Sequence, residues 1–183
     1  RVRRVRLVWP DRTPPSSWSE LIASLAEHKQ ALCIVNLKRH ARALAAALKE
    51  QGVEGLGHLS TDMCPAHRCK ALATARERLR KREPCRLIST QCVEAGVDID
   101  FPVVFRAWGP LEALAQAAGR CNREGRLPEG EVRVFLPPED GGRAYPTGAY
   151  GQAAAAAEGL FRLHIESGKE PDITAPDLFR AYY

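Results

Sequence analysis

The sequence lacks several features that would assign it to a common functional class. It contains no run of about 18 apolar residues and no visible signal peptide, so no segment is expected to span a membrane as a helix. Its six cysteines form no CxxC pair, which argues against a zinc finger or ribbon, and we expect no metal site. No acid–base pair or nucleophile constellation stands out. These absences disfavour a helical membrane protein and a free-standing enzyme that acts on a small ligand.

The composition is that of one ordinary domain. With 183 residues, of which 45% are hydrophobic, the chain can bury a sizeable core. The first residue is Arg1 and the only methionine, Met63, is internal, so we expect a piece of a longer protein. The net charge of +5 favours a polyanionic partner, although an arginine- and alanine-rich proteome explains it equally well. The cysteines are expected to be free thiols, which is typical of a reducing cytoplasm.

Short apolar runs alternate with helical stretches along most of the chain. The runs expected to form strands are residues 5–9, 31–35, 55–59, 85–89, 103–106 and 131–136. The helices are expected from Ser17 onward and over residues 38–51, 65–81, 110–119, 152–166 and 175–183. This alternation is typical of an α/β domain with a mostly parallel sheet of about six strands and helices on both faces. We therefore predict a domain over residues 1–136, followed by a Pro/Gly-rich loop and helical extension over 137–183.

Ligands of such folds bind at the carboxyl ends of the strands, which selects the loops 36–40, 60–65, 89–100 and 120–126. In the last of these regions, Arg120 and Arg123 are three residues apart, and Gln116 precedes Arg120 by four. On a continuing helix the three side chains share one face, and Gly119 would let another segment pack closely behind them. Two guanidinium groups and an amide can grip a phosphate. The alternative is a solvated basic turn.

The stretch Ser-Thr-Gln-Cys-Val-Glu-Ala-Gly-Val-Asp-Ile-Asp at 89–100 links two expected strands. Thr90 stands at a strand end, where its hydroxyl could hold a phosphate. Gly96 would let the backbone approach a ligand closely, and Asp98 could accept a hydrogen bond from a ribose hydroxyl. The alternative is an acidic turn in which Asp98 and Asp100 are local caps.

Together the two stretches resemble motifs V and VI of superfamily 2 helicases, which combine a small polar pair, a Gly-hydrophobic-Asp turn and Gln-x-x-Gly-Arg-x-x-Arg. Val-Glu-Ala-Gly-Val-Asp-Ile-Asp followed by Gly-Arg-Cys-Asn-Arg is most similar to the CRISPR-associated helicase-nuclease of type I systems. DEAD-box proteins instead tend to have Arg-Gly-Ile-Asp and a His-Arg start to motif VI. The resemblance covers most of the chain and implies a three-layer RecA-like domain, the second lobe of a two-lobed motor.

For the nucleotide, the resemblance implies that Arg123 is an arginine finger with Arg120 as its partner on the phosphates, while Gln116 contacts the γ-phosphate region or the attacking water. The residues implied to line the nucleotide side are Gly96, Asp98 and Gly119. The sequence has no Gly-x-x-x-x-Gly-Lys-Ser/Thr loop and no Asp-Glu-x-His box. ATP and magnesium would therefore be held mainly by a first lobe, and the isolated chain is expected to be inactive.

For nucleic acid, the resemblance implies that the loops after three strands follow the backbone of single-stranded DNA. The residues implied are Asn36, Lys38, Ser60, Thr61, Thr90 and Gln91. Simpler alternatives are a helix N-cap for Ser60 or Thr61 and a plain turn for Asn36. The implied partners are a first RecA-like lobe, an HD nuclease that is fused or coupled to it, and a CRISPR RNA-guided surveillance complex.

Two other functions remain open at the level of the sequence. The chain could be a lobe of another superfamily 2 motor, such as a repair or RNA helicase, and the residues alone do not separate DNA from RNA. It could also be a non-catalytic nucleic-acid-binding module that kept the fold and lost the motor. An HD-type His-Asp pair upstream would favour the CRISPR assignment, whereas a missing phosphate-loop lobe would favour the binding module.

Overall fold

Six parallel strands form the centre of the computed structural model, which describes residues 4–10, 17–93, 96–138, 143–168 and 171–183. The strands are β1 (Val5–Val8), β2 (Gln30–Ile34), β3 (Leu56–Leu59), β4 (Cys85–Ser89), β5 (Val103–Ala107) and β6 (Gly130–Phe135). They lie in the order β1-β6-β5-β2-β4-β3, and every pairing in this sheet is parallel. The α/β prediction of about six mostly parallel strands is confirmed, and each expected strand is present.

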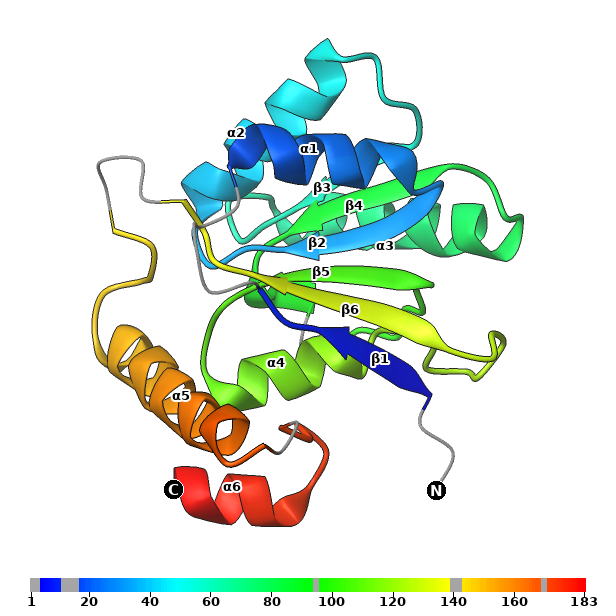
Figure 1. Ribbon diagram of the computed structural model, residues 1–183. Helices are drawn as coiled ribbons and strands as arrows, with labels where there is room; N and C mark the ends of the chain where they lie inside the picture. Colours follow the sequence, from blue (N-terminus) through cyan, green and yellow to red (C-terminus); the bar gives the residue numbers. More distant parts are fainter. Residues whose placement is uncertain (1–3, 11–16, 94–95, 139–142, 169–170) are drawn as a thin grey trace.

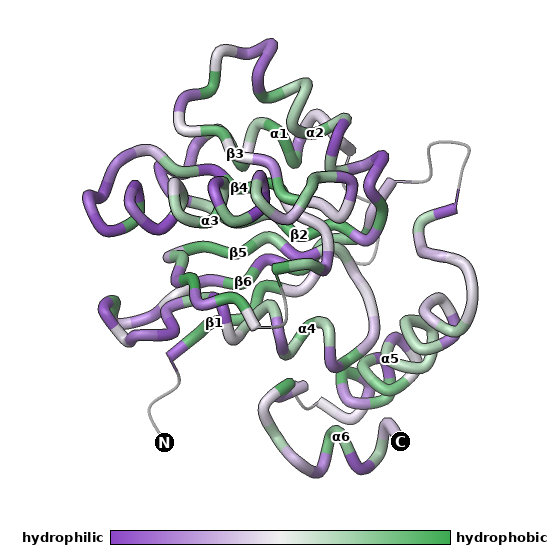
Figure 2. Tube along the Cα trace, turned by 180° about the vertical axis from the view of Figure 1, so that it is seen from behind, coloured by the Kyte–Doolittle hydropathy of each residue, from purple (hydrophilic) through white to green (hydrophobic). Residues whose placement is uncertain are grey.

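Helices cover both faces of the sheet, as predicted for a three-layer fold (Figure 1). Their bounds are α1 (Trp18–Glu27), α2 (Lys38–Glu50), α3 (Pro65–Arg80), α4 (Leu111–Ala118), α5 (Ala149–Glu166) and α6 (Pro176–Tyr182). Helices α1 and α2 share one apolar layer with the sheet, and α3, α4 and α5 share the other. Figure 2 shows hydrophobic segments along the central strands and hydrophilic segments on the outer part of α3.

Local sequence signals explain where two of these helices begin. The Ser17 side chain accepts a hydrogen bond from the backbone N–H of Glu20, and the Glu20 carboxylate accepts one from the backbone N–H of Ser17, so the two residues form a capping box. Helix α3 begins with Pro65, whose missing N–H costs nothing in a first turn. The residue that caps α3 is Cys64, so the alternative in which Ser60 or Thr61 is the N-cap is wrong.

Three cysteines lie buried in the sheet layers, and we call Cys33, Cys85 and Cys121 the buried thiols. Burial raises the pKa of Cys33 to about 12, that of Cys85 to about 11 and that of Cys121 to about 12. Cys64 and Cys69 are exposed, and we call them the exposed thiols. All of the cysteines in the described residues are free, as the sequence predicts.

The extension after β6 packs on the same core. Phe161 of α5 lies edge-on to Trp9 and Trp108, with ring centroids 4.7 and 5.3 Å apart. The Trp108 indole N–H donates to the backbone oxygen of Ala154 at 3.1 Å, and the Tyr182 hydroxyl of α6 donates to that of Ala153 at 3.0 Å. These contacts anchor α5 and α6 beside α4 (Figure 1).

None of the helices within the described ranges has both the length and the apolar character needed to cross a membrane. Residues 11–16, Glu94 and Ala95 of the 89–100 stretch, and residues 139–142 of the expected Pro/Gly-rich loop lie outside the described residues.

Candidate functional site

The candidate residues fall into two groups at opposite ends of the sheet. Asn36 follows β2, Ser60 follows β3 and Thr90 follows β4, so this group lies at the carboxyl ends of the strands. The loop 120–126 lies at the other end, because Arg120 and Asn122 exchange backbone hydrogen bonds of 2.9 and 3.0 Å with Phe101, just before β5. The prediction that this loop joins the others at the carboxyl ends is wrong. Helix α4 follows β5 and runs back across the sheet, which returns the chain to the amino ends.

At the carboxyl ends, a pocket of about 500 Å³ gathers most of the first group. We call it the groove. It is lined by Asn36, Leu37, Lys38, Arg39, Thr61, Thr90, Gln91, Cys92, Arg143, Pro146 and Thr147. Five of the six residues expected to bind nucleic acid are among these, and Ser60 is not. The residues that the sequence did not single out come from the first turn of α2, the turn after β4 and the segment before α5.

Asn36 is the buried centre of a hydrogen-bond network beneath the groove. Its side-chain amide donates to the backbone oxygen of Trp108 at 2.8 Å, and its side-chain oxygen accepts from Arg106 at 2.9 Å and from the Tyr150 hydroxyl at 3.0 Å. Its backbone oxygen accepts from the Gln91 side chain at 3.2 Å. Asn36 is 4% exposed. Its side chain thus links the end of β2 to the end of β5 and to α5, and it is almost completely buried beneath the groove.

Arg106 and Tyr150 are members of this network that sequence reasoning missed. Arg106 is 0% exposed and also donates to the backbone oxygen of Ala107 at 2.6 Å and to the Tyr150 hydroxyl at 2.9 Å. The sequence does offer a signal for Arg106, because it stands at the end of an apolar strand. A charged group buried there needs hydrogen-bond partners, so its position predicts a polar network. The partner Tyr150 lies on α5, 44 positions away, and no local pattern connects the two.

Polar groups from α2 and from the β3 loop lie on one side of the groove. The Lys38 ammonium donates to the Asp62 carboxylate at 2.6 Å, and this hydrogen bond lowers the pKa of Asp62. Thr61 is exposed, whereas Ser60 is fully buried, with a side-chain oxygen that has no hydrogen-bond partner among the described residues. Thr61 and Lys38 can therefore meet a ligand directly, and Ser60 cannot without a local rearrangement.

At the amino ends, the arginines do not extend a helix as expected. Helix α4 ends at Ala118, so Arg120 and Arg123 lie in the following turns and the shared helical face with Gln116 is not formed. The Arg120 Nε donates to the backbone oxygen of Val93 at 3.1 Å. Arg123 pairs with Asp98 at 3.0 Å, and the two side chains are 46% and 77% exposed. Arg120 and Arg123 therefore each contact the 89–100 stretch from a turn, whereas Gln116 remains on the helix.

The two glycines of the candidate site, Gly119 and Gly96, differ in their surroundings. A Cβ on Gly119 would meet only backbone oxygens of its own preceding turn, at 3.3 and 3.7 Å, so within the described chain no other segment packs closely behind the arginines. Gly96 has a φ of +67°, a left-handed conformation that favours glycine, and a Cβ there would point into open space. The backbone at Gly96 is therefore open to a close approach, as expected.

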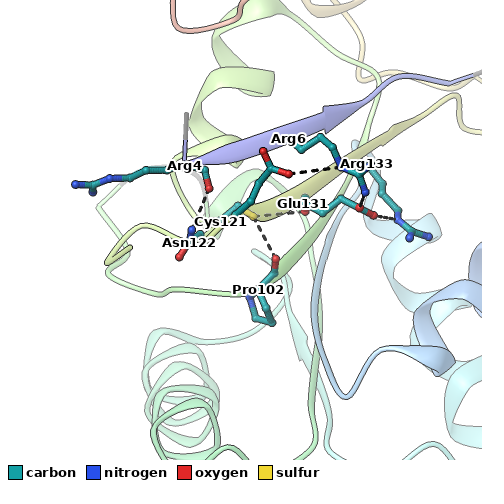
Figure 3. A network of polar contacts seen from close by, with 8 residues as sticks. Arg4, Arg6, Pro102, Cys121, Asn122, Glu131 and Arg133 are labelled. Atoms are coloured by element: carbon teal, nitrogen blue, oxygen red, sulfur yellow. Dashed lines mark hydrogen bonds and ion pairs between the residues drawn. The ribbon is translucent and has the colours of Figure 1, made fainter. Parts of the chain in front are cut away.

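Two residues that sequence reasoning did not assign to the site fix the arginine loop. The Asp100 carboxylate accepts hydrogen bonds from the backbone N–H of Arg123 at 2.8 Å and of Glu124 at 3.3 Å. Asn122, with a φ of +44°, donates to the backbone oxygens of Arg4 and Leu127 at 3.0 and 2.9 Å. Figure 3 shows Asn122 facing the Arg4 carbonyl beside Cys121. Asp100 had been considered only as a local cap, but it closes a loop 23 positions away.

The described residues contain no cluster of three or more His, Cys, Asp or Glu side chains that could hold a metal ion. The positive groups at the arginine loop, together with the open backbone at Gly96, can serve an anionic ligand. The groove can serve an extended anionic ligand through hydroxyls, amides and cations.

The fold is shared with solved structures of a helicase-nuclease. The T. fusca Cas3-ATP structure matches with a TM-score of 0.71 and 20% identity, over 99% of this chain and 23% of that chain. A structure described as a CRISPR RNA-guided surveillance complex, pre-nicking, matches with a TM-score of 0.69 and 20% identity, over 98% of this chain and 24% of the matched one. At this identity the likeness establishes the RecA-like fold.

Sequence comparison identifies the family. A stretch of 40 residues, 22% of this chain, is 60% identical to the CRISPR-associated nuclease/helicase Cas3 of Haloferax volcanii, of which it covers 4%. The chain therefore spans only a small part of its relatives. The family described as "CRISPR-associated nuclease/helicase Cas3, C-terminal" matches residues 27–126, which is more than half of the chain and includes both candidate motifs. The chain therefore belongs to this Cas3 family, as a C-terminal helicase lobe of superfamily 2.

Proposed function

We propose that this lobe is the second motor lobe of an ATP-dependent translocase or helicase that moves along single-stranded DNA in CRISPR interference. The observation that carries the proposal is that one segment, 89–100, touches both candidate sites. It begins at the groove with Thr90, and its Val93 backbone oxygen accepts from Arg120 at 3.1 Å. It ends with Asp98 beside Arg123. A change at the arginine loop can thus reach the groove through a single stretch of backbone.

At the nucleotide side, this lobe would supply positive charge to ATP held by another lobe. The Arg123 guanidinium is 46% exposed, and its partner Asp98 is more exposed still, so the pair can open at little cost. We assign Arg123 the role of arginine finger and Arg120 that of its partner on the phosphates, where positive charge stabilises phosphoryl transfer. Gln116 is exposed on the last turn of α4 and would contact the γ-phosphate region or the attacking water.

The rest of the nucleotide site follows from what this sequence contains. Gly96, Asp98 and Gly119 would line the nucleotide side. The sequence has no phosphate loop, and its described residues form no metal-binding cluster, so ATP and magnesium would be held mainly by the first RecA-like lobe.

At the nucleic-acid side, the groove would hold the backbone of single-stranded DNA. Lys38, Thr61 and Gln91 line it and offer an ammonium group, a hydroxyl and an amide, which suit phosphates and carry no sequence preference. Asn36, Ser60 and Thr90 would act mainly by shaping the loops, because all three are buried. Closure of the two lobes on ATP and their opening after hydrolysis would shift these loops along the strand.

The partners of this lobe are proposed from its relatives. Members of the family are described as nuclease/helicase proteins, so we propose an HD-type nuclease that is fused or coupled to the motor. A similar structure is described as part of a CRISPR RNA-guided surveillance complex, and we propose that a complex of this kind delivers the DNA.

The test separates ATP turnover from DNA binding in the complete protein. Arg123→Ala should abolish DNA-stimulated ATP hydrolysis, because removal of an arginine finger typically costs about 10³- to 10⁵-fold. The same variant should bind a labelled oligo(dT) about as tightly as the parent protein, since Arg123 lies at the opposite end of the sheet. Normal turnover in Arg123→Ala would remove this residue from its role. Robust ATP hydrolysis by the 183-residue chain alone would overturn the two-lobe scheme.

A further inference from the structure

The groove has a second wall, which comes from the segment before α5. Arg143, Pro146 and Thr147 line the pocket together with the first turn of α2. The Arg39 guanidinium of that turn donates to the backbone oxygen of Arg143, which fastens this segment to the rim. Arg143 and Thr147 are exposed. The groove is therefore a channel between the RecA-like core and the extension, rather than a surface of the core alone.

A buried contact fixes this wall in place. The Tyr150 hydroxyl, three residues after Thr147, donates to Asn36 at 3.0 Å and accepts from Arg106 at 2.9 Å. A Cβ on Gly109 would lie 2.8 Å from this hydroxyl and 3.3 Å from the Arg106 guanidinium. Glycine at 109 thus leaves room for Tyr150 to reach the network. The docked position of the extension therefore depends on Gly109, just after β5, and on Tyr150 of α5.

The charges around the groove favour a contribution from the second wall. Lys38 on the first wall is already paired with Asp62 at 2.6 Å, so much of its positive charge is offset. Arg143 is exposed and lines the same groove from the segment before α5, and none of the ion pairs among the described residues involves its side chain. A guanidinium group and the Thr147 hydroxyl are both common donors to phosphate oxygens.

We propose that residues 143–147 form a wall of the nucleic-acid groove and that Arg143 and Thr147 contact the phosphates of the bound single strand. Tyr150 is the positioning residue that holds this wall through the Asn36–Arg106 network. The inference rests on the proposed function, because it takes the groove as the site of single-stranded DNA. It adds the extension, which the motifs do not reach, to the binding surface.

The test is the affinity of the complete protein for labelled oligo(dT), measured by fluorescence anisotropy over a range of salt concentrations. Arg143→Ala should weaken binding about threefold to tenfold near physiological salt and should reduce the slope of log K against log salt by about 0.7, the value for one phosphate contact on a single strand. Arg162→Ala is the matched control, because Arg162 is an exposed arginine of α5 that does not line the groove. It should leave both values unchanged.

A second variant tests how the wall is held. Tyr150→Phe keeps the ring but removes both hydroxyl hydrogen bonds, and it should lower the affinity and the salt slope in the same direction as Arg143→Ala. If Tyr150 acts by positioning Arg143, the affinity of the double variant Arg143→Ala, Tyr150→Phe should be no lower than that of whichever single variant binds more weakly. Fully additive losses would overturn this positioning role.

The outcomes separate the inference from the function beneath it. If the parent protein binds single strands and Lys38→Ala weakens that binding, but Arg143→Ala binds like the parent, then the second wall is refuted and the groove stands. If the parent protein does not bind single strands, or Lys38→Ala and Thr61→Ala have no effect, the groove itself is refuted. Preferential binding of an oligo(U) RNA would assign the same channel to an RNA motor.

Discussion

One buried asparagine, Asn122, helps to hold the loop that carries Arg123, and the cost of replacing it can be estimated. Asn122 is 2% exposed and makes three side-chain hydrogen bonds, to the backbone oxygens of Arg4 and Leu127 and from the backbone N–H of Leu127 at 3.0 Å. Each such bond contributes about 1 kcal/mol net, so Asn122→Gly should lower the free energy of unfolding by about 3 kcal/mol.

Comparison of two substitutions at position 122 isolates the free-energy cost of its left-handed backbone conformation. Asn122 has a φ of +44°, which glycine adopts freely and alanine does not. Asn122→Ala should therefore be destabilised by about 1 kcal/mol more than Asn122→Gly, although alanine is the better residue in most other positions. Both variants should also lower ATP turnover in the complete protein, because the loop that presents Arg123 loses its anchor.

The assay is urea unfolding of the 183-residue chain, with Glu124→Ala as the control. Glu124 is an exposed neighbour whose side chain pairs with Arg126, so its removal should change the free energy of unfolding by less than about 0.5 kcal/mol. If Asn122→Ala is as stable as Asn122→Gly, the left-handed backbone is refuted. If both variants are as stable as the control, the hydrogen bonds of the Asn122 side chain are refuted.

Two further predictions concern charge and thiols. Asp62→Asn should tighten single-strand binding at pH 7, because it releases Lys38. Pairing with Lys38 lowers the pKa of Asp62, so the stability from this pair should be present at neutral pH and lost only as the pH falls below the usual 3.8. Acid titration of unfolding should show this loss in the parent chain and not in Asp62→Asn. At pH 8 the exposed thiols should react with Ellman's reagent, whereas the buried thiols, with pKa values raised to about 11 or 12, should react only in urea.

The centre of the sheet was predictable because its middle strand, β2, follows an apolar run. The run at 31–35 is covered on both faces, so burial leaves a continuous apolar pattern that needs no knowledge of the partners. Helix starts were predictable where a capping residue or a proline marks them, as at Ser17 and Pro65. In each case the signal lies within a few residues of the feature that it predicts.

The end of α4 shows where local signals fail. Gln116, Arg120 and Arg123 have helical spacing, but the helix stops at Ala118. The loop is instead held by two tertiary hydrogen bonds. Asn122 donates back to the backbone oxygen of Arg4, and Asp100, which precedes β5, accepts from the backbone N–H of Arg123. The helical spacing of these residues predicts a shared face only if the helix continues through Arg123. Helix α4 instead gives way to a loop that is held by tertiary hydrogen bonds.

The same distinction explains why the groove was only half predicted. Its first wall consists of residues next to strand ends, which any parallel α/β sheet marks as binding positions. Its second wall is placed by Tyr150, whose partners Asn36 and Arg106 lie 114 and 44 positions away. Because a buried arginine must be hydrogen-bonded, Arg106 helps to fix where the extension docks, and the extension contributes Arg143, Pro146 and Thr147 to the lining of the groove. A substitution at Gly109 or Tyr150 should therefore alter the proposed nucleic-acid groove without changing either of the two motif stretches, 89–100 and 116–126.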